Sequence, residues 1–283
     1  MSKPEKSAEK QPSARLDFKK AARDLLRDHP ETAGRLLIID PETRERHGTP
    51  VARLRGRTNK LFRTHLKESF KKAKETTGAI ADVIRLGSVS AVVLTAGRET
   101  PEKALFDLHR QAGRLLVTRT GTHIRYFQSL FGSPYAAENA AADVYAAVRH
   151  LRQGENCDLI ERVSRERAVD FLRTGEPEHL TSFALDKVRC GGKAFTALKA
   201  DEVVEAVQKI VTAHTPSRAD SDALVKEFAA LKGKPLDEAG LKLLADIAQT
   251  SKNPLVKELA GYLVPEAPVA VPLPAQKQKP PQP

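Results

Sequence analysis

The densest charge in this chain of 283 residues lies in one segment, residues 53–74, which reads RLRGRTNKLFRTHLKESFKKAK. Nine of its residues are Lys or Arg and one, Glu68, is acidic, whereas the whole chain carries a formal net charge of +11. Lysine and arginine side chains pair with phosphate oxygens, so their concentration is typical of a surface that binds a polyanion. This segment is therefore the first candidate for a functional site.

The spacing within the segment predicts a helix with two different faces. At about 100° per residue, five cations fall within one narrow sector of a helix: Lys60, Arg63, Lys67, Lys71 and Lys74. An apolar stripe lies about a quarter turn away and consists of Phe62, Leu66, Phe70 and Ala73. We expect a basic helix over residues 57–76 that packs through the apolar stripe and presents its cations outward.

A second group of cations follows at residues 110–125, where they are interleaved with aromatic residues. Rings such as Tyr126 and Phe127 can stack on the bases of a single strand and would extend the same surface. The alternative is that the charges form a solvated face and the rings are buried. The candidate nucleic-acid-binding residues are Arg53, Arg55, Arg57, Lys60, Arg63, Lys67, Lys71, Lys74, Arg114, Arg119 and Arg125.

Common catalytic and metal-binding motifs are absent from the sequence, which contains no GxxxxGK[ST], GxGxxG, HExxH or GxSxG. The eight histidines are scattered singly, and Cys157 and Cys190 do not have the spacing of a metal site. We therefore predict no catalytic residue, no metal and no cofactor.

One segment resembles part of an enzyme family. Residues 179–195, HLTSFALDKVRCGGKAF, are similar to the Ser-containing second strand of ADP-ribosyltransferases, in which a Thr-Ser-Phe-like run precedes a helix. The family adds an Arg on an earlier strand and a Glu-x-Glu on a later one, whereas here Glu202 and Glu205 are three residues apart. The alternative is an amphipathic helix whose inward residues are Leu180, Phe183, Ala184 and Val188.

Composition favours a mainly α fold. Hydrophobic residues make up 40% of the chain, but aromatic residues make up only 5% and Trp is absent, which suits packed helices better than an aromatic-rich sandwich. Helix starts are marked by a capping residue before proline at Thr100, Ser133 and Asn253. We predict about eleven helices, over residues 16–28, 57–76, 79–86, 101–117, 134–153, 158–173, 177–190, 201–214, 219–231, 237–249 and 253–264.

For three segments the sequence does not decide the secondary structure. Residues 35–40 could pair with Val51–Leu54 as a small β-hairpin within residues 35–54. Residues 88–95 form a short apolar run that fits either a buried helix or a strand. Residues 114–127 fit either a hairpin around Gly121 or two helices broken there.

Composition also divides the chain into regions. Residues 1–14 are a polar leader and residues 266–283 are a Pro-rich tail, and both are expected to be disordered. Residues 15–215 are expected to form the helical core, which contains the basic helix. Residues 216–265 are expected to form a three-helix unit that is either a satellite bundle or the end of the same domain.

The sequence favours a protein of a reducing compartment. Its N-terminus has no apolar run typical of a secretory signal, no apolar stretch is long enough to span a bilayer, and the two cysteines form no disulfide framework. We expect a cytoplasmic protein. A polar leader is also compatible with export by a non-classical secretion system.

The function expected first is nucleic-acid binding, with RNA or single strands favoured over duplex DNA because a long cationic row follows a phosphate backbone. The alternative is a helical interaction protein without enzymatic activity, such as an adaptor, a regulator or a secreted effector. Its basic helix would meet an acidic protein or a membrane surface, and its Pro-rich tail would recruit a protein partner. An ADP-ribosyltransferase-like enzyme ranks third.

Overall fold

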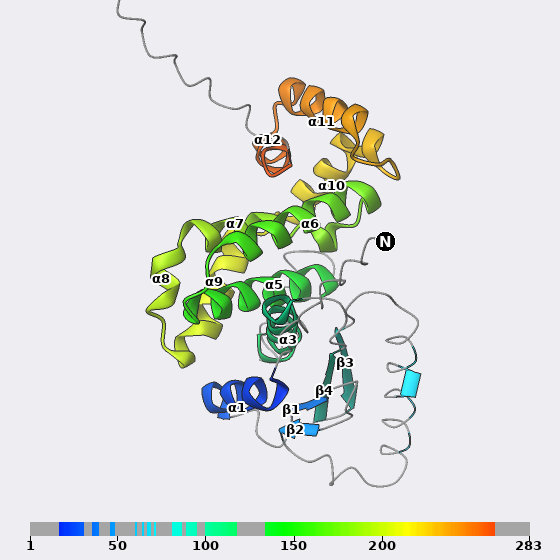
Figure 1. Cartoon of the computed structure of the whole chain (residues 1–283). Helices are drawn as coiled ribbons and strands as arrows, with labels where there is room; N and C mark the ends of the chain where they lie inside the picture. The colour runs from blue at the N-terminus through cyan, green and yellow to red at the C-terminus, as the bar shows by residue number, and fades with distance from the viewer. Residues whose placement is uncertain are drawn as a thin grey trace, which may run out of the picture.

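The protein is mainly helical, as its composition predicts. The computed structural model describes residues 17–30, 36–39, 46–48, 60, 64, 67–68, 71, 81–86, 89–94, 100–117 and 134–263. Ten α-helices and four strands are defined within these ranges, and Figure 1 shows their arrangement. The leader and the Pro-rich tail for which we predict disorder lie outside the described residues.

A mixed four-stranded sheet lies on one side of the molecule (Figure 1). Its strands are β1 (Leu36–Ile39), β2 (Arg46–Gly48), β3 (Ala81–Leu86) and β4 (Val89–Leu94), in the order β2-β1-β4-β3. The pairs β1–β2 and β3–β4 are antiparallel, whereas β1 and β4 run parallel. Helices α1 (Phe18–Asp28) and α3 (Pro101–Leu116) contact the sheet.

The sheet corrects two of our sequence predictions. The hairpin exists, but β1 pairs with Arg46–Gly48, and Val51–Leu54 lies outside the described residues. The helix predicted over residues 79–86 is wrong, because Ala81–Leu86 forms strand β3 and pairs with β4. A short apolar run fits either element, so its pairing partner decides the structure. The ambiguous run at residues 88–95 is likewise a strand.

Helix α5 (Pro134–Arg152) is the centre of the first hydrophobic core. It contacts α3, α7 (Ser182–Cys190), α8 (Gly192–Thr196) and α9 (Ala200–His214). Six of its ten buried apolar residues are alanines, which allow neighbouring helices to approach closely. The approach is close at Gly113 of α3, where an added Cβ would lie 2.8 Å from Cβ of Tyr145.

A second core joins helix α6 (Asp158–Thr174) to the C-terminal helices. These are α10 (Arg218–Glu227), α11 (Glu238–Thr250) and α12 (Pro254–Gly261), with the 3₁₀ turn η4 (Ala229–Leu231) after α10. Phe171 of α6 meets Phe228 edge to face, with 6.2 Å between ring centroids. The three C-terminal helices therefore share apolar contacts with residues of the larger region.

Local signals place most helix ends correctly, with two corrections. The helix predicted over residues 219–231 ends at Glu227 as α10, and the 3₁₀ turn η4 follows it. Residues 177–190 do not form a single helix, because the 3₁₀ turn η3 (Pro177–His179) precedes α7. The short helix α8 after Gly191 was not predicted. Gly175 ends α6 with φ of 71°, a left-handed conformation that suits glycine.

Two predicted caps are confirmed, and the third, Ser133, lies outside the described residues. The Thr100 hydroxyl accepts from Lys103 N, and Asn253 Oδ1 accepts from Leu255 N. Replacing Thr100 with Ala should lower the free energy of unfolding by about 1 kcal/mol, because the first turn of α3 loses an acceptor. Thermal or urea unfolding measures the change. Thr100→Ser keeps the hydroxyl and should lose much less; equal losses in both variants would contradict the capping role.

Candidate nucleic-acid interface and its surroundings

The described residues of the basic segment are helical and exposed. They are Lys60, Thr64, Lys67, Glu68 and Lys71, and the Thr64 hydroxyl donates to the Lys60 carbonyl oxygen at 3.1 Å. On a continuous α-helix the three lysines would fall within a sector of about 40° and span about 16 Å along the axis. These positions suit a row of cations that faces solvent.

The remaining candidate cations of this segment lie outside the described residues, as do the apolar residues Phe62 and Phe70 that were expected beneath them. The cations are Arg53, Arg55, Arg57, Arg63 and Lys74. Arg119 and Arg125 of the second group also lie outside. The structure therefore places three lysines of the segment and two residues of the second group, Arg110 and Arg114.

Arg114 lies between α3 and α5, where its side chain is only partly exposed. Its guanidinium donates to Asn139 Oδ1. Burial lowers the pKa of Arg114, and the nearby Arg110 lowers it further. Arg114 therefore takes part in a polar network between helices, and the structure does not bring it together with the three lysines.

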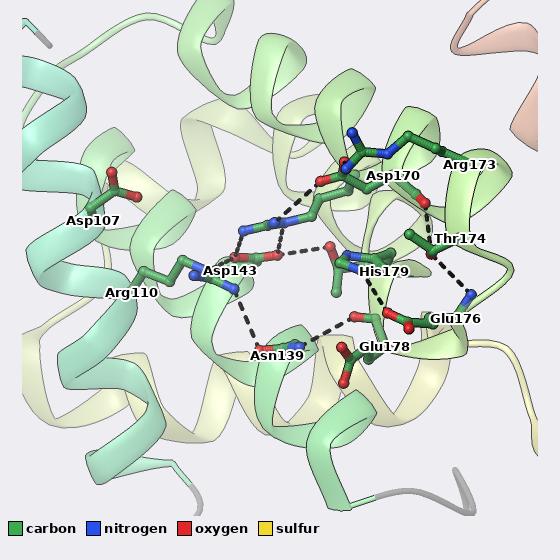
Figure 2. Close-up of polar contacts among 12 residues, drawn as sticks. Asp107, Arg110, Asn139, Asp143, Asp170, Arg173, Thr174, Glu176, Glu178 and His179 are labelled. Atoms are coloured by element: carbon green, nitrogen blue, oxygen red, sulfur yellow. Dashed lines mark hydrogen bonds and ion pairs between the residues drawn. The ribbon is translucent and has the colours of Figure 1, made fainter. Parts of the chain in front are cut away.

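That network is organised by Asp143 of α5, which is completely buried (Figure 2). Arg110 of α3 donates from Nε to Oδ1. Arg167 of α6 donates from Nε to Oδ2 at 2.8 Å and from Nη2 to Oδ1 at 3.3 Å, and Thr181 donates to Oδ2 at 2.8 Å. Each carboxylate oxygen accepts two hydrogen bonds, so the buried charge is fully satisfied.

The pKa of Asp143 reflects this environment. Burial alone would raise the pKa, but Arg110, Arg167 and Thr181 outweigh burial and hold it well below its ordinary value of 3.8. In return, the attraction of Asp143 raises the pKa of Arg167 despite its burial. The carboxylate is thus permanently ionised near neutral pH and joins α3, α5, α6 and the start of α7.

Asn139 extends the network by one turn of α5. Its Oδ1 accepts from Arg110 as well as from Arg114, and its amide donates to the Glu178 carbonyl oxygen at 3.5 Å (Figure 2). The arginines of this region therefore have structural partners inside the protein. Our sequence analysis missed Asp143; its signal is a single acid in the alanine-rich run AAADVYAAVRH.

A second polar cluster attaches α1 to α5. Asp28 pairs with Arg149 and also lies 3.5 Å from Arg152, while His29 shares a 2.7 Å hydrogen bond with the Tyr145 hydroxyl. Burial would raise the pKa of Asp28, but these arginines keep it below its ordinary value. The cluster thus combines an ion pair with a hydrogen bond between the Tyr145 hydroxyl and the His29 ring nitrogen. Together they attach the end of α1 to α5.

One group of possible metal ligands is found among the described residues: Glu176, Glu178 and His179. Their ligand atoms lie within 4.8 Å of one another, and His179 is 3.4 Å from Glu176 (Figure 2). Two carboxylates and a histidine at the surface commonly pair without an ion. The cluster therefore supports no metal assignment.

The segment that resembles ADP-ribosyltransferases does not form their strand. Ser182–Cys190 is helix α7, and its inward residues Phe183, Ala184 and Val188 are buried, as is Leu180 just before the helix. The amphipathic alternative predicts this burial. Glu202 accepts from the Lys199 backbone amide, and Glu205 pairs with Lys209 on the exposed side of α9. Both acids have local partners on a helix, where the family has a strand.

Comparison with family models, with curated proteins and with solved structures finds no match for this chain. Its function must therefore be argued from its own residues. None of the helices that the structure describes is long and apolar enough to cross a membrane.

Proposed function

We propose that this protein binds nucleic acid, RNA or a single strand, through its basic helix. The observation that carries the proposal is the exposure of Lys60, Lys67 and Lys71 on helical residues at spacings that place them on one face. Like charges at these spacings repel one another, and a phosphate backbone lying across them would remove that repulsion.

The buried arginine network supports a division of roles among the cations. Arg110 and Arg167 both pair with Asp143, so their guanidinium groups point to a partner inside the protein. The exposed lysines carry charge outward, where it attracts a polyanion over several ångströms. A single strand suits this row of lysines because its flexible backbone can place successive phosphates beside successive lysines.

An acidic protein or an anionic membrane surface would use the same lysines and is the competing partner. The two classes differ in what the protein carries during purification. A nucleic-acid binder should show a high absorbance ratio of 260 to 280 nm that salt and nuclease treatment remove. Protein partners that persist after nuclease treatment, or binding to anionic liposomes alone, would support the competing class.

The change that tests this proposal is Lys67→Gln together with Lys71→Gln. At physiological salt the double variant should bind fluorescent RNA and single-stranded DNA about 10-fold more weakly, because two phosphate contacts are lost. The loss should be similar for all sequences, since phosphates carry no sequence information. Fluorescence anisotropy measures the dissociation constants.

A matched control removes two exposed lysines from the C-terminal unit, Lys242→Gln and Lys252→Gln. This variant has the same net charge as the test variant, so a general charge effect would weaken both equally. We expect the control to bind nearly as tightly as the parent. Equal binding by all three proteins would contradict a role for the basic helix.

A further inference from the structure

The fold brings together the two cysteines of the chain, which are far apart in sequence. Cys157 is the residue just before the first turn of α6, and Cys190 is the last residue of α7. Cys157 is partly buried and Cys190 is exposed, and both are free thiols. Helices α6 and α7 pack against each other (Figure 1). This packing fixes the position of the start of α6 relative to the end of α7.

Two distances locate the Cys157 thiol beside the turn that contains Cys190. Its Sγ lies 3.6 Å from the carbonyl oxygen of Arg189. The same Sγ would lie 3.9 Å from a Cβ built on Gly192. Arg189 and Gly192 lie on either side of Cys190 in the sequence. The Cys157 thiol is therefore in contact with the segment that contains Cys190.

The Cys190 thiol can leave its present contact. The Cys190 thiol now contacts Asp186 Oδ2 at 3.7 Å on its own helix, and rotation about its Cα–Cβ bond would release it. The next two residues are Gly191 and Gly192, which allow the backbone to adjust toward the Cα separation of about 4.4–6.8 Å that a disulfide requires.

We propose that Cys157 and Cys190 form a reversible disulfide bond that joins the start of α6 to the end of α7. Hydrogen peroxide would oxidise the exposed Cys190 to a sulfenic acid and release one water. The Cys157 thiolate then attacks that sulfur, the S–S bond forms, and hydroxide leaves as a second water. In sum, two thiols and one peroxide give one disulfide and two waters, and a dithiol reductant reverses the change.

The bond would act on the helix pair that links the two cores. Residues near the cysteines, such as Leu159 and Val188, belong to the first core, whereas Phe171 and Phe183 at the other end of the pair belong to the second. Oxidation would close a loop of about thirty residues and restrict the unfolded chain. The oxidised protein is therefore the more stable form.

Peroxide treatment of the purified full-length chain, followed by intact mass and peptide mapping under non-reducing conditions, tests the bond. We expect a loss of two hydrogens, a linked peptide pair containing Cys157 and Cys190, and a midpoint of thermal unfolding several degrees higher that dithiothreitol reverses. Cys157→Ser should give no such linked pair and should leave Cys190 as a sulfenic acid or as a disulfide between the Cys190 residues of two copies.

Cys157→Ser and Cys190→Ser are compared with the parent under reducing conditions first, so that any loss of fold is seen separately. Two titratable thiols after peroxide treatment would overturn the proposal. So would oxidation that yields only dimers linked through Cys190, because Cys157 would then play no part.

Discussion

Replacing Asp143 with Ala should lower the free energy of unfolding by about 3–5 kcal/mol, because it leaves buried guanidinium groups without their counter-charge. Arg110 and Arg167 have side chains only 15% and 19% exposed, so water cannot replace the carboxylate fully. Thr181 would lose its acceptor as well. Urea unfolding followed by circular dichroism measures the change.

Two variants separate this effect from the loss of any acid. Asp222 is an exposed aspartate on α10, and Asp222→Ala should change stability by no more than about 0.5 kcal/mol. In the double variant Asp143→Ala with Arg167→Ala, part of the loss should be recovered, because one uncompensated charge is removed. If Asp143→Ala alone cost less than about 1 kcal/mol, the network would not be a main support of the fold.

The same carboxylate predicts a dependence of stability on pH. The pKa of Asp143 is lower in the folded protein than its ordinary value of 3.8, so the unfolded chain binds a proton first as the pH falls. The stabilisation is complete above about pH 5 and decreases progressively below it. Asp143→Ala should therefore show a shallower loss of stability between about pH 4 and pH 2 than the parent.

Replacing Phe171 with Ala should also lower the free energy of unfolding by about 3–5 kcal/mol, because it empties the centre of the second core. Phe171 is completely buried on α6 and stacks edge to face on Phe228 at the end of α10. The loss of stability should affect both α6 and the C-terminal helices that pack on it. Hydrogen exchange should become faster in α6 and in α10–α12 together.

This variant also tests whether residues 216–265 form an independent unit. Phe171→Leu keeps most of the apolar volume and should lose less than about 1.5 kcal/mol. If the C-terminal helices unfolded in a separate transition that neither substitution shifts, they would form a separate domain despite their contacts with α6.

Local chemistry explains which parts of the fold are predictable. The start of α3 at Thr100 follows from a hydroxyl before proline, and the end of α6 follows from Gly175. These signals act within a few residues, so they can be read without tertiary structure. The helices predicted over residues 101–117 and 158–173 accordingly match α3 and α6 to within a residue.

The sheet depends on contacts that no local signal contains. Strand β1 pairs in parallel with β4, whose residues lie more than fifty positions further along the chain. The run Ala81–Leu86 is apolar enough for a buried helix, and only its pairing with β4 makes it a strand. The error over residues 79–86 therefore reflects long-range pairing.

The buried network depends on long-range contacts as well. Asp143 meets Arg110, Arg167 and Thr181, which lie 33, 24 and 38 residues away. Sequence spacing groups Arg114 with the exposed cations. In the structure its side chain donates to Asn139 instead. Exposure at Lys60, Lys67 and Lys71 could be predicted because the helical period alone places them on the polar face.

The salt dependence of nucleic-acid binding tests the role of the basic helix most directly. The logarithm of the binding constant should fall linearly with the logarithm of salt concentration, with a slope of about 0.7 for each phosphate contacted on a single strand. Lys67→Gln with Lys71→Gln should reduce that slope by about 1.4, whereas Lys242→Gln with Lys252→Gln should leave it unchanged. Parallel lines for the parent and the Lys67/Lys71 variant would show that these lysines do not contact the nucleic acid.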